Sequence, residues 1–233
     1  MILARRVVDD IRRRDFQAGD RLPPERVMLE SYQVGRGTLR EALRFLELQN
    51  VISLKPGPGG GPTVEKPDAS TLAMTMLLLL QFDHAPYSAV VETRRDLEPL
   101  MARLAAERMT ADELRHLADN VDQMRTQLHD YAVFLYTNHE FHDIIAWGTH
   151  NSVYGFLIDA LLDILDGSAL GVDYPEQRRE AVLRAHVSIL EALQAHDGAS
   201  SRDAMERHVE EYVKYVNEKF PDIVTRRVNW DIS

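Results

Sequence analysis

The segment 22–64 most constrains the fold, because helix, turn and strand signals follow one another closely within it. The two prolines at 23–24 fit the first turn of a helix that runs to about Tyr32. Gly35 can cap the next helix, which continues to about Gln49. This order predicts two short helices joined by a tight turn.

A hairpin is predicted directly after the second of these helices. Residues Val51–Lys55 alternate between apolar and polar as a strand does, and Thr63–Glu65 can return as the second strand. Between them, Pro56–Pro62 is rich in the glycine and proline that turns require. With a further helix over 3–14, the segment predicts a winged helix-turn-helix of three helices and a β-hairpin wing.

Three arginines form a stripe on the second helix of the pair. Arg36, Arg40 and Arg44 recur at i, i+4 and i+8, so their guanidinium groups share one face. The opposite face is apolar and can bury in a core; it comprises Leu39, Ala42, Leu43 and Leu46. Guanidinium groups bind phosphates and the major-groove edge of guanine. The stripe is therefore typical of a DNA-reading helix, although a solvated face with i, i+4 ion pairs has the same pattern.

Charge is divided unevenly along the chain of 233 residues, whose net charge is −10. Residues 1–66 carry a net charge of +3, and residues 67–233 carry −13. A mildly basic head on an acidic body favours a first domain that meets phosphates. The chain has no cysteine, which excludes disulfides and thiolate chemistry and leaves His, carboxylate and amide groups as possible metal ligands.

After residue 70 every segment has a helical pattern, and no strand pattern competes. This predicts a mainly α protein whose second part is an all-α bundle of six or seven helices. The expected helices lie at 70–82, 86–108, 110–129, 131–147, 151–166, 175–196 and 200–219. We expect a DNA-binding domain over 1–66, a linker and connecting helix over 67–81, an effector domain over 82–221 and a tail over 222–233.

No segment predicts a membrane location. The apolar run at 72–82 is too short to cross a bilayer, and the N-terminus lacks the apolar core of a signal peptide. A cytoplasmic protein is the expectation.

Four polar residues of the helical part are spaced as if to meet. Asn138 and His142 are four residues apart, so they project from one helix face. His186 and His208 lie at similar distances before and after the break at Gly198, so an antiparallel pair of helices would bring them to similar heights.

Apolar neighbours indicate that the three histidines point inward, where three protonated imidazoles would repel one another. A divalent cation such as zinc or nickel, bound by three neutral imidazoles and one oxygen, resolves that conflict. Histidines that are simply hydrogen-bonded in a core remain an alternative. An enzyme is not expected, because no HExxH motif or carboxylate pair accompanies the three histidines.

The pieces LPPERVML, VGRGTLREALRFLELQNVI and GPGGGPTV together resemble the winged-helix signature of the GntR family of bacterial transcription regulators. The helical remainder is similar to the effector-binding FCD domain of the FadR branch, through 92–106, 138–151, 184–197 and the segment ending at His208. The resemblance implies a homodimer that binds double-stranded operator DNA. It also implies a small carboxylic-acid effector, often held through a metal ion, that changes DNA affinity.

The resemblance also implies which residues of the head meet DNA. Positions that match the family's reading and phosphate-binding residues are Arg26, Arg36, Thr38 and Arg40, and Gly57 matches a wing position near the minor groove. Gly35 stands where the family usually has Ser or Thr, so one hydroxyl contact to phosphate is missing.

In the helical part, the resemblance implies a metal site at Asn138, His142, His186 and His208 and an effector-binding arginine at Arg94. The family has Asp where this chain has Asn138, so the site has lost one negative charge. The sequence thus predicts an effector-controlled regulator, most often a repressor, with a metal-dependent enzyme and a helical adaptor as the alternatives.

Overall fold

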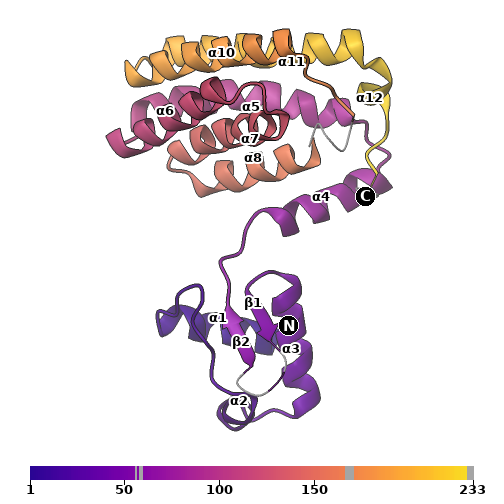
Figure 1. Cartoon of the computed structure of the whole chain (residues 1–233). Coiled ribbons are helices and arrows are strands. Elements are labelled where there is room, and N and C mark those ends of the chain that lie inside the picture. The colour runs from indigo at the N-terminus through magenta and orange to yellow at the C-terminus, as the bar shows by residue number, and fades with distance from the viewer. Residues whose placement is uncertain (56, 58–59, 166–170, 230–233) are drawn as a thin grey trace. The chain divides into compact units, whose positions relative to one another are not determined.

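The computed structural model describes residues 1–55, 57, 60–165 and 171–229 and divides into two compact units, Met1–Thr71 and Leu72–Ser233 (Figure 1). Parts of three expected features lie outside the described residues: positions 56, 58 and 59 of the hairpin tip, the helix end at 166 and residues 230–233 of the tail.

The first unit is the predicted winged helix-turn-helix, which is confirmed. Its helices are α1 (Ile2–Arg13), α2 (Glu25–Tyr32) and α3 (Arg36–Leu48), and its strands are β1 (Ile52–Lys55) and β2 (Gly61–Val64). Gly35 stands at the N-cap of α3, as expected, and Gln33 makes the turn after α2 with a left-handed φ of 54°. One apolar core joins α1, α2, α3 and the hairpin, with Leu39, Met28 and Ile52 almost fully buried.

The wing is an antiparallel hairpin in which Ile52 pairs with Val64 and Lys55 pairs with Gly61. A preceding segment lies along its outer strand, because the amide of Leu22 donates to Pro62 O at 2.9 Å and that of Val64 donates to Asp20 O at 2.8 Å. These bonds satisfy backbone groups that an isolated two-stranded hairpin leaves open and so fix the wing to the head.

Helix α4 (Ser70–Phe82) is apolar around most of its surface, yet only Ala73 and Leu77 are buried. Leu79 is 66% exposed and Phe82 is 83% exposed. Most of the apolar side chains of α4 are therefore not buried within the single chain. Within the described residues, no helix combines the length and apolarity needed to cross a bilayer.

The second unit is the predicted helical bundle, which is also confirmed. Its main helices are α5 (Tyr87–Arg108), α6 (Ala111–Thr126), α7 (Tyr131–Gly148), α8 (Ser152–Ile164), α10 (Glu176–Gln194) and α11 (Gly198–Lys219). Helix α5 packs against α7, α8, α10 and α11, which makes it the centre of the bundle (Figure 1). The core residues between these helices include Ala102, Phe141 and Ile189, none of which is exposed.

The end of the chain is fastened to the start of α5. A short helix, α12 (Pro221–Thr225), follows α11. Beyond it, Arg226 O accepts from the amide of Tyr87 at 3.0 Å, and the amide of Val228 donates to Ala85 O at 2.9 Å. The described part of the segment 222–233 therefore packs on the bundle as far as Val228, which is 2% exposed.

Candidate DNA-reading surface and candidate metal centre

The arginine face of α3 points to solvent, while the opposite face fills the core of the head. Arg36, Thr38, Arg40 and Arg44 are all exposed. Arg40 forms an ion pair with Glu25: its Nε lies 3.6 Å from Glu25 Oε1, and the arginine side chain is 74% exposed. Such an exposed pair contributes at most about 1 kcal/mol, so it does not keep Arg40 from phosphates.

A groove of about 610 Å³ separates α3 from the wing. Its lining includes Arg40, Arg44, Lys55 and Gly57, so cations stand on both of its sides. Gly57 has a left-handed φ of 97°, a conformation that favours glycine at this turn. Arg26 on α2 pairs with Glu30 at 3.0 Å, and both side chains are largely exposed.

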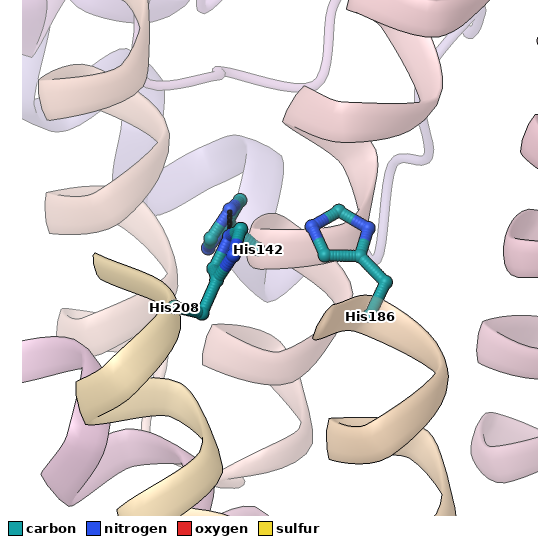
Figure 2. A group of neighbouring side chains, drawn as sticks. All are labelled: His142, His186 and His208. Atoms are coloured by element: carbon teal, nitrogen blue, oxygen red, sulfur yellow. Dashed lines mark hydrogen bonds between the residues drawn. The ribbon is translucent and has the colours of Figure 1, made fainter. Parts of the chain in front are cut away.

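The three predicted histidines meet inside the bundle (Figure 2). His142 comes from α7, His186 from α10 and His208 from α11, and each offers a ring nitrogen within 4.8 Å of the others. All three are buried. Their meeting depends on the sharp turn between α10 and α11, where Asp197 caps α11 through a bond from the amide of Ser200.

Several ring nitrogens of the buried imidazoles have no hydrogen-bond partner. Nε2 of His142 and Nε2 of His208 lie 3.3 Å apart, which lets one ring donate to the other. His186 stacks on Phe141 with ring centroids 3.6 Å apart, and both of its ring nitrogens are buried without a hydrogen-bond partner. An orphaned buried polar atom is costly, so a ligand for His186 is expected.

The electrostatics of the cluster favour neutral rings. Burial, followed by the neighbouring histidines, lowers the pKa of His186 well below its ordinary value, and burial lowers the pKa of His208 to about 3. Burial also lowers the pKa of His142, against the opposing effect of Glu98. Neutral imidazoles with free lone pairs are the form that binds zinc or nickel, so the residues fit a divalent metal ion.

Sequence reasoning missed Glu98, which is buried beside the cluster. Its Oε2 lies 2.5 Å from Nδ1 of His142, although this contact lacks hydrogen-bond alignment, and its Oε1 accepts from Nε of Arg94. Burial would raise the pKa of Glu98, but Arg94 and then His142 outweigh it and hold the pKa below the ordinary value. A carboxylate at Nδ1 favours the tautomer that leaves Nε2 free for a metal.

Arg94 and Asn138 line one cavity together with two of the histidines, His142 and His208. This cavity, of about 30 Å³, is bounded by Arg94, Asn138, His142, Tyr174, Arg178 and Tyr212, among others. A second cavity of about 160 Å³ lies between α10 and α11 and shares Arg178, Val182 and His208 with the first. Tyr174, Arg178 and Tyr212 were not predicted. Their positions before or on long helices carry no spacing signal that links them to the histidines.

Two family descriptions match the chain. "Bacterial regulatory proteins, gntR family" matches residues 3–60, and "FCD domain" matches residues 89–211. The first match covers the three helices and the first strand of the head. The second covers the parts of the helices that carry Arg94, Glu98, Asn138 and the three histidines.

Similar curated proteins are transcriptional regulators. The Bacillus subtilis protein named "Uncharacterized HTH-type transcriptional regulator YcbG" is 28% identical over 92% of this chain and 86% of its own length. The "HTH-type transcriptional repressor NanR" of Cronobacter sakazakii is 29% identical over 85% of this chain and 78% of its own length.

Solved structures share the fold. "Streptococcus agalactiae GntR" superposes with a TM-score of 0.73 at 26% identity, covering 91% of this chain and 97% of that one. "E. coli McbR/YncC" has a TM-score of 0.52 at 18% identity over 94% of this chain and 98% of that one, which extends the likeness of fold alone.

Proposed function

Because the chain belongs to the GntR family of bacterial transcriptional regulators, in the FadR branch that carries an FCD domain, we propose that it is an operator-binding repressor controlled by a small carboxylic acid. Residues 1–66 bind DNA, 67–81 connect, 82–221 bind the effector, and 222–233 form the tail. The family regulates transcription, so the enzyme alternative is set aside.

The observation that carries the DNA-binding part is the free arginine face of α3 beside the wing. Arg36, Thr38 and Arg40 read bases or hold phosphates in the major groove, while Arg26 and Gly57 contact the flanking backbone and the minor groove. Support comes from their exposure and from the groove between α3 and the wing, where the three cations outnumber the two carboxylates, Glu25 and Glu47. A bacterial protein with this role acts in the cytoplasm.

A gel-shift assay of the full chain with the intergenic DNA upstream of its own coding region tests this role. We expect retardation at low salt and its loss in the double variant Arg36→Ala/Arg40→Ala. Arg12→Ala is the matched control, because it removes an exposed arginine from α1 instead. Absence of retardation by the unaltered chain would contradict DNA regulation, and partner-protein binding without it would favour the adaptor alternative.

For the effector part, we propose that His142, His186, His208 and Asn138 hold a divalent metal ion, zinc or nickel. The unpartnered nitrogens of His186 support this. When bound, the ion supplies positive charge for a carboxylate. Arg94 lines the same cavity and adds guanidinium donors for the acid. Elemental analysis of the purified chain tests the metal; less than a tenth of an equivalent after loading and desalting would contradict it.

We propose that the chain works as a homodimer, whose two heads read half-sites about 34–36 Å apart. The exposed apolar side chains of α4 support self-association, since a large exposed apolar patch calls for cover. The acid changes DNA affinity by binding one arrangement of the heads more tightly than another. Native mass spectrometry gives the subunit count and any retained acid; a monomer at micromolar concentration would contradict the dimer.

A further inference from the structure

We propose that Arg178 receives a second anionic group of the effector, so that the ligand is a small dianion such as a dicarboxylate. This inference rests on the proposed effector function of the bundle. It concerns a residue of α10 that neither the spacing of the histidines nor the family resemblance singled out.

The first step is that the charge of Arg94 is already balanced inside the protein. Arg94 and Glu98 are both buried, and Nε of Arg94 donates to Oε1 of Glu98. The two side chains form a buried ion pair, which has no net charge. Arg94 can still donate hydrogen bonds to an acid, but it adds no net charge to the cavity.

The second step is that Arg178 has no such partner. In the ranges that the structure describes, no Asp or Glu forms an ion pair with Arg178, and its Nε is buried without a hydrogen bond. Its guanidinium lies 4.6 Å from the ring centroid of Tyr215, which holds it in place by a cation–π contact. Arg178 is thus a positioned cation with an unused buried donor.

The third step is its location. Arg178 borders the cavity that contains Arg94, Asn138 and His142, and also the larger cavity between α10 and α11. His208 borders both as well. Arg178 and His208 thus border the same space, so a short ligand bound at His208 by one end would meet Arg178 with the other.

Among the described residues, the smaller cavity has no acidic lining residue, and the larger one adds one acid and one base, Glu211 and Arg207. The other polar lining residues of the smaller cavity include Tyr174, Tyr212 and Asn138, whose side chains are not acids that ionise near pH 7. Asn138 is an amide, and it stands where a carboxylate would have neutralised part of a bound cation. Because the Arg94–Glu98 pair has no net charge, the charge of Arg178 is not balanced and makes the site cationic. A cationic site favours a dianion.

Cavity size limits the ligand to a short molecule. Volumes of about 30 and 160 Å³ fall below the roughly 300 Å³ of a pocket for a drug-sized molecule. Dicarboxylates of three to five carbons are suitable probes, and monocarboxylates of the same length are their matched controls.

Calorimetric titration of the metal-loaded full chain with malonate, succinate and glutarate, and with propionate, butyrate and valerate, tests the proposal. We expect at least one dicarboxylate to bind roughly tenfold or more tightly than its monocarboxylate partner. In Arg178→Gln that ratio falls to about one, and Arg178→Lys keeps part of it. Arg184→Gln, which removes an exposed arginine from the same helix, leaves the ratio unchanged.

Equal affinity for both series, or a ratio that survives Arg178→Gln in a variant with an unchanged melting temperature, would overturn the proposal; so would failure of all six acids to bind. Gel shifts on the same preparations separate this failure from that of the regulator function. DNA binding that responds to monocarboxylates alone would leave the regulator in place and remove only the role of Arg178.

Discussion

Oε2 of Glu98 lies 2.5 Å from Nδ1 of His142, so a buried carboxylate on α5 stands directly behind one imidazole of the histidine cluster. The same carboxylate accepts a hydrogen bond from Arg94 through its other oxygen. Glu98 therefore connects the residue proposed to meet the acid with a residue proposed to hold the metal. It is the group through which the two halves of the site affect each other.

Glu98→Gln should damage both stability and metal binding. It leaves Arg94 as an unpaired buried cation, which costs about 3–5 kcal/mol of unfolding free energy. It also removes the carboxylate behind His142, which should lower metal affinity by about 10- to 100-fold. Urea unfolding and competition with a chelator measure the two effects.

Glu107→Gln is the matched control for that variant. Glu107 pairs with Arg103 at 2.7 Å on the same helix with the same i, i+4 spacing, but both side chains are well exposed. The control should cost less than about 1 kcal/mol. Equal losses in the two variants would show that the buried pair has no special role.

The metal-free protein should lose stability as the pH falls below about 6.5. A histidine in the unfolded chain takes up its proton near pH 6.5. The folded pKa of His208 is depressed to about 3, so its contribution is complete above 6.5 and is lost toward 3. Between about pH 6.5 and 5 this loss is on the order of 2 kcal/mol.

Urea unfolding of chelator-treated protein across that range measures the slope. In the unfolded chain the pKa of Glu98 is near 4.5, and in the fold it is lowered. The stability that Glu98 contributes is therefore lost mainly below that pH, outside the range measured. His208→Leu should make the decline between about pH 6.5 and 5 shallower without abolishing it, because His142 and His186, whose pKa values are also lowered, add to it. An unchanged slope in that variant would mean that His208 is not held neutral by burial.

Asn138→Asp should strengthen metal binding. The amide of Asn138 borders the cavity with His142 and His208, and replacing it with a carboxylate adds a charged oxygen ligand for a divalent ion. We expect at least a tenfold gain in affinity by chelator competition. Asn151→Asp, a change at the N-cap of α8, is the control and should leave affinity unchanged.

Arg40→Ala should weaken DNA binding in a salt-dependent way. If Arg40 holds a phosphate, its loss reduces the slope of log affinity against log salt concentration by about 0.9. Fluorescence anisotropy between about 50 and 200 mM salt measures that slope. An unchanged slope with relaxed sequence preference would instead assign Arg40 to base reading.

Two glycines of the head should respond in opposite directions. A Cβ on Gly60 would clash with the carbonyl oxygen of Lys55, so Gly60→Ala should distort the wing and reduce DNA binding. A Cβ on Gly37 meets nothing within 4 Å, and Gly37→Ala should stabilise α3 by up to about 1 kcal/mol. Thermal unfolding and gel shifts distinguish the two; a stabilising Gly60→Ala would contradict the clash with Lys55.

Local signals were enough to predict most of the fold. Gly35, the Pro-Pro pair at 23–24 and the break at Gly198 are positional markers, and the structure begins or ends helices beside each of them. His186 and His208 could be paired from the sequence because both lie on helices that meet at one short turn. Their distances from that turn fix their heights without any knowledge of the rest of the bundle.

Glu98 could not be found in the same way. Arg94 and Glu98 at i, i+4 look like an exposed ion pair, and their burial arises because α7 and α11 cover α5. One signal was present: Arg94 and Glu98 continue the face that carries the buried Met101 and Ala105. Arg178 needed the tertiary structure, since its place beside the histidines depends on how α10 lies against α11.

Two backbone hydrogen bonds, between Arg226 and Tyr87 and between Val228 and Ala85, tie the segment after α12 to the junction of α4 and α5. The chain passes from α4 into the bundle through this junction. We expect these two bonds to hold the start of α5 in place relative to the segment after α12. We expect a chain cut after Phe220 to keep the residues of both proposed binding sites but to show weaker coupling between effector binding and DNA binding.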